Sequence, residues 1–112
     1  MIGLAILICY TKQITFKKMK NLKTIEEVRK KIDELDLEIL DLIYRRKGFV
    51  DIVVKLKTKD QIIDKARIEF ILKKLDVESR KKGLPAEMIR DIWKQMIEGF
   101  ISYEKKYFEE KK

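Results

Sequence analysis

The chain has 112 residues, which is enough for one domain with a modest hydrophobic core but not for two. Its 27 Lys and Arg residues outnumber 19 Asp and Glu residues, and the net charge of +8 fits an anionic partner such as a nucleic acid, a membrane surface or a small polyanion. There is no His, and Cys9 is the only Cys, which excludes an internal disulfide and a Cys/His metal site. The many charged residues, few Gly and one Pro favour a helical cytoplasmic protein.

Residues 1–18 differ in composition from the rest of the chain. Residues 1–10 are apolar but far too few to span a bilayer, and neither the basic start nor the cleavage site of a signal peptide is clear. A plain helical pattern begins at Met19. We therefore interpret 1–18 as an N-terminal extension, from an upstream start codon or as a loosely packed segment, and 19–112 as the helical domain. A signal or membrane anchor and an added strand or helix are the alternatives.

The spacing of apolar residues predicts a first helix over residues 24–57. Thr24 and Glu27 form a capping box. Apolar residues then recur at intervals of three and four, and Gly48 is the only weak point. At 1.5 Å per residue this helix is about 50 Å long, whereas a compact domain of this size measures about 30–35 Å across. Because two short helices cannot cover so long a stripe, the sequence predicts an intertwined dimer.

Two further helices, over residues 64–82 and 85–109, are predicted after a break in the pattern. Asp64 can cap the first of them, and Gly83 is a residue that commonly ends a helix. Pro85 suits the first turn of the last helix. The predicted fold is therefore all-α, with a long, a short and a long helix in an intertwined dimeric helical bundle.

Three cations of the first helix suggest a binding site: Arg29, Arg46 and Lys57. Arg46 and Lys57 are eleven residues apart, which at about 100° per residue places them on nearly the same face, about 16 Å apart along the axis. Two long side chains at this spacing could hold a small dianion between them. Arg29 lies seventeen residues before Arg46, about 25 Å away, so it cannot reach the same small ligand from its own helix. It is either an ordinary surface charge or part of a site in a second copy of the chain.

Residues 28–46, 62–72 and 92–108 contain three motifs. In this order and at these separations, they resemble the all-helical class of chorismate mutases and its relative, isochorismate pyruvate lyase. VRKKIDELDLEILDLIYRR, residues 28–46, resembles a first-helix motif in which R-x-x-I-D-x-x-D precedes an apolar run ending in Arg, and Lys57 follows that Arg at the family's distance. IIDKARIEFIL, residues 62–72, has Arg67 at its centre, and IWKQMIEGFISYEKKYF, residues 92–108, resembles the last helix. Each motif is weak alone, but the three together are specific.

The resemblance implies an enzyme that converts chorismate to prephenate in phenylalanine and tyrosine biosynthesis. This intramolecular Claisen rearrangement needs no cofactor, metal or nucleophile, and its partner is a small dicarboxylate rather than a nucleic acid or a membrane. The enzyme must hold the substrate in its folded, reactive conformer. It must also stabilise the negative charge that builds on the ether oxygen as the C–O bond breaks. Arg suits the carboxylates because its planar fork binds them with two parallel hydrogen bonds.

The resemblance also implies a role for individual residues. Arg46 holds one carboxylate, and Arg29 of the other protomer holds the second. Lys57 contacts the ether oxygen and a carboxylate, and Arg67 helps to shape the pocket for the acidic ligand. Apart from the resemblance, Phe100 is interpreted as a core or dimer-interface residue of the last helix that is also expected to line the pocket.

Two positions depart from the pattern of many family members. Glu104 stands where many have Gln, and a carboxyl donates to the ether oxygen only when protonated, whereas an amide donates at any pH. Ile68 stands where many mutases have a Glu that accepts the ring hydroxyl, so Asp64 or a nearby backbone group has to substitute. The lyase relatives are less strict at the second position. Cleavage of isochorismate to salicylate and pyruvate is therefore an alternative.

A non-catalytic basic helical module that binds nucleic acid is a second alternative, and an inactive helical dimer descended from a mutase is a third. Positive and negative residues are interspersed along every predicted helix, with neither a single basic recognition face nor a helix-turn-helix pattern. This distribution disfavours the nucleic-acid module.

Overall fold

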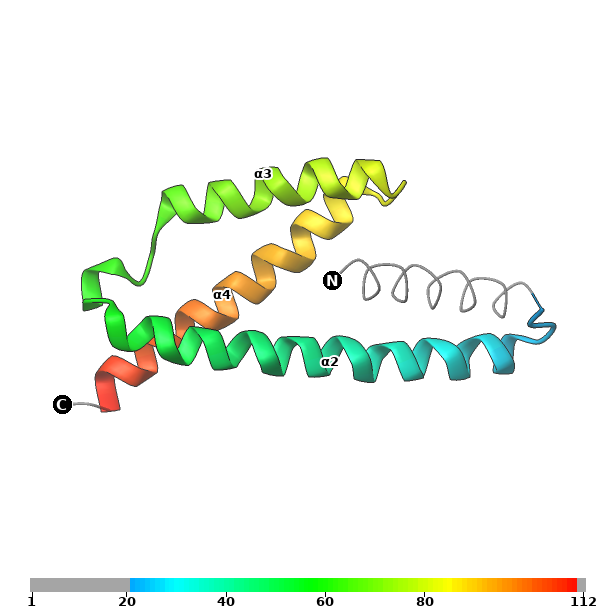
Figure 1. The fold of residues 1–112 in the computed structure, drawn as a ribbon, viewed down its shortest axis with the longest axis horizontal. Coiled ribbons are helices and arrows are strands. Elements are labelled where there is room, and N and C mark those ends of the chain that lie inside the picture. Colours follow the sequence, from blue (N-terminus) through cyan, green and yellow to red (C-terminus); the bar gives the residue numbers. More distant parts are fainter. Residues whose placement is uncertain (1–20, 111–112) are drawn as a thin grey trace, which may run out of the picture. The chain divides into compact units, whose positions relative to one another are not determined.

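A computed structural model describes residues 21–110, and those residues contain helices and no strand (Figure 1). The long helix α2 (Ile25–Leu56) is followed by a 3-10 turn, η1 (Lys59–Gln61), then by the shorter helix α3 (Lys65–Lys81) and by α4 (Ala86–Glu110). This order confirms the predicted all-α fold with a long, a short and a long helix. The proposed extension, residues 1–18, lies outside the described residues. The chain divides into two compact units, Met1–Tyr44 and Arg45–Lys112.

In the first unit, α2 begins at the capping residues that the sequence indicates. The backbone N–H of Glu27 donates to Thr24 Oγ1 at 3.1 Å, and the Glu27 carboxylate accepts from the backbone N–H of Lys23 at 2.9 Å. Glu26 and Glu27 also place negative charge at the positive end of the helix dipole.

The apolar stripe on this part of α2 is exposed in the single chain. Each member is more than a third exposed, and Ile39 is 54% exposed. The stripe includes Ile25, Val28, Ile32, Leu35, Ile39, Leu42 and Ile43. A continuous apolar face of this length is typical of a helix that packs against a partner.

The second unit contains a hairpin of α3 and α4. Asp64 caps α3, because its Oδ1 accepts a hydrogen bond from the backbone N–H of Arg67 at 3.0 Å. The hairpin turns at Gly83, whose φ of 72° is the left-handed conformation that favours glycine. Near the turn, Arg90 of α4 pairs with Asp76 of α3 at 3.2 Å.

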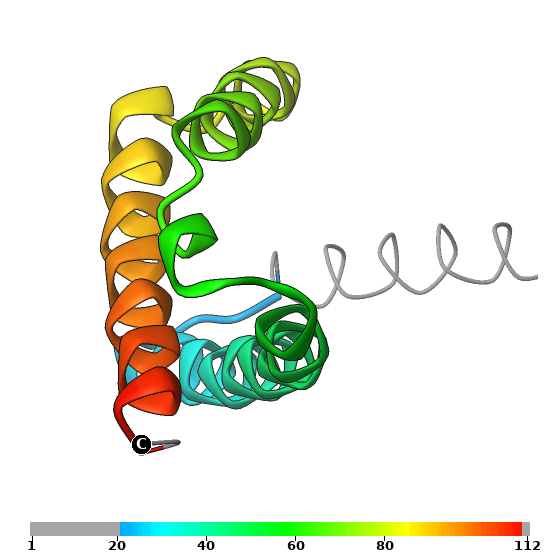
Figure 2. The ribbon, with the colours of Figure 1, turned by 90° about the vertical axis from the view of Figure 1, so that its left-hand side faces the viewer.

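The most buried apolar side chains of the described residues all belong to the second unit. The segment between α2 and α3, residues 57–64, is called here the linker. Four apolar residues are each less than a tenth exposed: Val54 of α2, Ile62 of the linker, Leu72 of α3 and Ile97 of α4. Figure 2 shows how these elements meet. The first turns of α4 lie beside α3, and its later turns lie beside the last turns of α2. One buried carboxylate, that of Glu104, lies on the same helix as Ile97.

Candidate functional site

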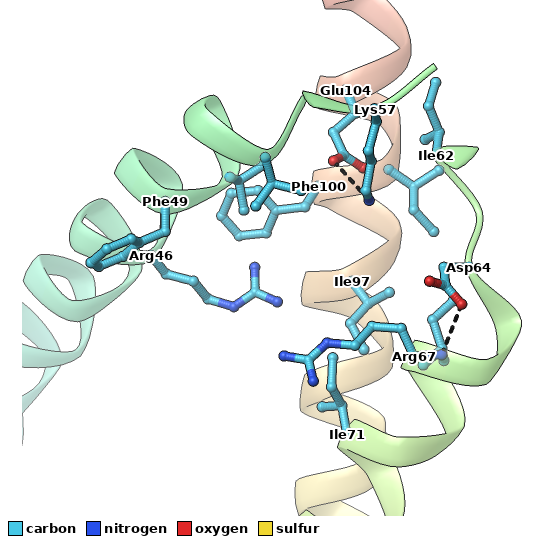
Figure 3. Close-up of a pocket in the computed structure, with 14 residues that line it drawn as sticks. Arg46, Phe49, Lys57, Ile62, Asp64, Arg67, Ile71, Ile97, Phe100 and Glu104 are labelled. Atoms are coloured by element: carbon cyan, nitrogen blue, oxygen red, sulfur yellow. Dashed lines mark hydrogen bonds and ion pairs between the residues drawn. The ribbon is translucent and has the colours of Figure 1, made fainter. Parts of the chain in front are cut away.

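A cavity of about 260 Å³ lies within the second unit, lined by the last turns of α2, by the linker, and by α3 and α4 (Figure 3). Pockets for drug-sized molecules and cofactors span roughly 300–1,000 Å³. The volume of this cavity lies just below that range, which suits a small ligand. Most of the lining is apolar and rich in Ile. Its charged members are three cations and two acids: Arg46, Lys57, Arg67, Asp64 and Glu104.

Two guanidinium groups face each other across this cavity. Arg46 extends from α2 and Arg67 from α3, and Figure 3 shows their charged ends pointing toward one another. Burial lowers the pKa of Arg46 from its usual value, the charge of Arg67 lowers it further, and Glu104 opposes the shift. The Nη1 atom of Arg46 is buried and has no hydrogen-bond partner. A buried donor without a partner is costly, so an anion placed between the two cations would be bound favourably.

Phe100 of α4 supports the guanidinium of Arg46. The Cζ atom of Arg46 lies 4.7 Å from the centre of the Phe100 ring, within the range of a cation–π contact. The contact sets the Arg46 side chain against α4. It also leaves the hydrogen-bonding edge of the guanidinium available to a ligand.

Lys57 and Glu104 form an ion pair at the other end of the cavity. Lys57 follows the last residue of α2, and its Nζ lies 3.4 Å from Oε1 of Glu104 (Figure 3). The Glu104 side chain is only 7% exposed and that of Lys57 is 25% exposed. Lys57 therefore has a carboxylate partner inside the protein, in contrast to Arg46 Nη1.

The wall formed by the linker and the start of α3 is mainly apolar. Ile62, Ile68 and Ile71 line it, and Asp64 is its only acid. Because one oxygen of Asp64 caps α3, the remaining acceptor capacity of this carboxylate is what the wall offers to a ligand hydroxyl. Ile68 offers no polar atom on its side chain.

Seven of the eight residues predicted for the site line this one cavity: Arg46, Lys57, Asp64, Arg67, Ile68, Phe100 and Glu104. The eighth, Arg29, lies near the start of α2 in the first unit and does not line it. The other lining residues, among them Val50 and Val53, were not predicted for the site. Their positions four and seven residues after Arg46 place them on its helix face, and that spacing was the available signal.

None of the described helices is both long and apolar enough to cross a membrane. No curated protein matches the chain. The family model of chorismate mutase type II matches residues 28–105, more than two thirds of the chain. The match begins just before Arg29 and ends just after Glu104, so it includes every residue predicted for the site. The chain therefore belongs to the chorismate mutase type II family, and it is an isomerase that converts chorismate to prephenate.

Proposed function

We propose that the cavity is the chorismate site and that the protein supplies prephenate to phenylalanine and tyrosine biosynthesis in the cytoplasm. The observation that carries the proposal is the convergence of three cations on one small cavity, where a buried N–H of Arg46 has no partner. Chorismate carries two carboxylates and an ether oxygen, which are acceptors that such donors bind. Turnover of chorismate and of isochorismate by the purified protein is the experiment that tests the proposal.

In this proposal Arg46 binds and orients the substrate, and Lys57 stabilises the transition state. Arg46 binds one carboxylate with its unpaired edge and holds the substrate in the folded conformer, in which the carbon atoms that will be joined are close together. Lys57 contacts the ether oxygen and a carboxylate. As the C–O bond breaks and the C–C bond forms, the cation of Lys57 stabilises the negative charge on that oxygen. Arg67 balances the charge of the bound dianion from the α3 side of the cavity.

Glu104 is the second donor to the ether oxygen in its protonated form. Its carboxyl lies beside Lys57. A ligand oxygen that contacts Lys57 would therefore also be within reach of Glu104. As a carboxylate it accepts from Lys57 and repels a dianionic substrate, whereas the neutral acid donates a hydrogen bond.

Asp64 is the proposed acceptor for the ring hydroxyl of chorismate, because Ile68 has no polar side-chain atom. Cleavage of isochorismate is the second candidate function, and the apolar wall at Ile68 is the observation that favours it. Both substrates carry two carboxylates, so the cations do not discriminate between them. The position of the hydroxyl does, and that makes the wall around Asp64 the part of the cavity on which the choice depends.

Two copies of the chain share each active site in the proposed assembly. The exposed apolar stripe on α2 supports a dimer, because a second copy of the same helical protein would cover it. Arg29 supports a shared site, because it does not line the cavity of its own chain and lies seventeen positions before Arg46 on the same helix. Arg29 of one copy then binds the second carboxylate in the site of the other.

Mixing two inactive variants should restore activity if the sites are shared. A heterodimer of an Arg29→Ala chain and an Arg46→Ala chain has one site with both arginines and one with neither. Random mixing makes about half of the dimers heterodimers, so about one quarter of the parent's activity should return. The measurement is chorismate consumption by the refolded mixture and by each variant alone.

The control for this experiment is a chain that carries both substitutions, mixed with the parent chain. Its heterodimers contain no intact site, so an equal mixture should retain about one quarter of the activity of an all-parent sample, below the half that simple dilution would leave. Restoration in the first mixture, together with this loss beyond dilution in the control, supports the shared site. Light scattering that gives the mass of a single chain would contradict the dimer.

A further inference from the structure

Three polar side chains outside the cavity join α2 to α4: Lys47, Asp51 and Tyr103, called here the Tyr103 cluster. The hydroxyl of Tyr103 donates a hydrogen bond to Oδ1 of Asp51. The Nζ atom of Lys47 lies 2.9 Å from Oδ2 of Asp51 and 5.2 Å from the centre of the Tyr103 ring. Because Lys47 and Asp51 are one turn apart on α2, both act on the same point of α4.

The charges of the cluster reinforce each other. The hydroxyl of Tyr103, and after it Lys47, lowers the pKa of Asp51, while Asp51 and then Tyr103 raise the pKa of Lys47. Asp51 therefore loses its part of the interaction only as the pH falls through its lowered pKa, and Lys47 only as the pH rises through its raised pKa. The cluster is intact at neutral pH. In its ion pair the Lys47 side chain is 45% exposed and that of Asp51 is 36% exposed, so the pair contributes little to stability.

A direct path of contacts leads from the cluster to the cavity. The ring of Tyr103 meets the ring of Phe100 edge to face, with the ring centres 6.4 Å apart and the planes at 89°. Phe100 in turn carries the guanidinium of Arg46 on its face at 4.7 Å. Since Nη1 of Arg46 has no hydrogen-bond partner, its position depends on the Phe100 ring more than it would in a paired arginine.

We propose that Tyr103 is a positioning residue of the active site. Asp51 and Lys47 hold its ring in place, its ring fixes Phe100, and Phe100 holds Arg46 in the orientation that binds the ligand carboxylate. The cluster is also a second link between α2 and α4, in addition to the Lys57–Glu104 pair inside the cavity. The inference rests on the proposed role of Arg46 in the chorismate site. Its physical basis is preorganisation, because a guanidinium that is already oriented loses less entropy when the ligand binds.

The test uses Tyr103→Phe, which keeps the ring and removes only the hydroxyl, and Asp51→Asn, which keeps the shape and removes the charge. Each should raise KM for chorismate about three- to tenfold while kcat changes less than about twofold, as expected for lost uniform binding. The double variant should be no worse than the more affected single variant, because both changes break one network. In an Arg46→Lys background, Tyr103→Phe should have no further effect on KM.

The matched control is Asp76→Asn, which breaks the Arg90–Asp76 pair between α3 and α4. That pair has a similar exposure, 35% and 30%, and neither residue lines the cavity. KM should stay at the parent value in this variant. An unchanged KM in Tyr103→Phe, or an equal rise in Asp76→Asn, overturns the positioning role while leaving the proposed function intact. Full activity in Arg46→Ala overturns both the assignment of Arg46 and the positioning role built on it.

Discussion

Arg46→Ala and Lys57→Ala are each expected to lower kcat/KM for chorismate on the order of a hundredfold or more, the usual cost of removing a preorganised electrostatic donor. Among the described residues, Arg46 provides the only buried side-chain N–H group that lacks a partner, and Lys57 is the cation beside the buried carboxyl of Glu104. Water that fills the space of either removed side chain cannot provide a positive charge oriented toward the substrate. The measurement is the rate of chorismate consumption at several substrate concentrations.

Two neighbouring cations on the same helix provide matched controls for this experiment. Arg45 and Lys55 belong to α2, are exposed and do not line the cavity, so Arg45→Ala and Lys55→Ala should retain nearly full activity. The thermal stability of Arg46→Ala should change little, because Arg46 faces the cavity instead of filling the core. Lys57→Ala should lower it, because this change leaves the buried Glu104 carboxylate without its ion-pair partner. Near-full activity in either cavity variant would show that the roles inferred from the family do not apply to this chain.

Glu104 should make catalysis depend on pH in a way that Glu104→Gln abolishes. In the parent, only the protonated carboxyl donates to the ether oxygen, whereas the Gln amide donates at every pH. The ionised carboxylate keeps its ion pair with Lys57 and repels the dianionic substrate, which weakens both binding and chemistry. Glu104→Gln has a permanent donor of nearly the same shape, and it should match or exceed the parent at pH 8.

The decisive data are profiles of kcat/KM against pH for the parent, Glu104→Gln and a control, Glu98→Gln. Glu98 is an exposed acid on the same helix, so its substitution should leave the parent profile unchanged. Identical profiles for the parent and Glu104→Gln would mean that Glu104 does not face the ether oxygen.

The helices could be predicted from the sequence because their ends depend on local interactions. The Thr24 and Asp64 caps and the positive φ of Gly83 each involve residues within a few positions of one another, and the observed helix bounds differ from the predicted ones by a single residue. The spacing of Arg46 and Lys57 was readable for the same reason, since one helix carries Arg46 and ends just before Lys57.

The contacts that hold the site residues in place could not be predicted in this way, because they form between different helices. The Phe100 ring beneath Arg46 and the Lys57–Glu104 pair depend on how α4 packs against α2, which periodicity does not specify. The Tyr103 cluster left no signal at all, since its members have the ordinary composition of a helix surface. The sequence did identify the apolar stripe of α2, and in the single chain that stripe is exposed.

The most direct test of the central claim is an assay of the purified protein with chorismate and with isochorismate in parallel, in which prephenate and salicylate are quantified. The cations around the cavity bind either dicarboxylate, so the products reveal which reaction the site performs. We predict that chorismate is consumed with formation of an equal amount of prephenate, and that isochorismate yields little salicylate. Salicylate and pyruvate from isochorismate, with chorismate left unchanged, would contradict the account.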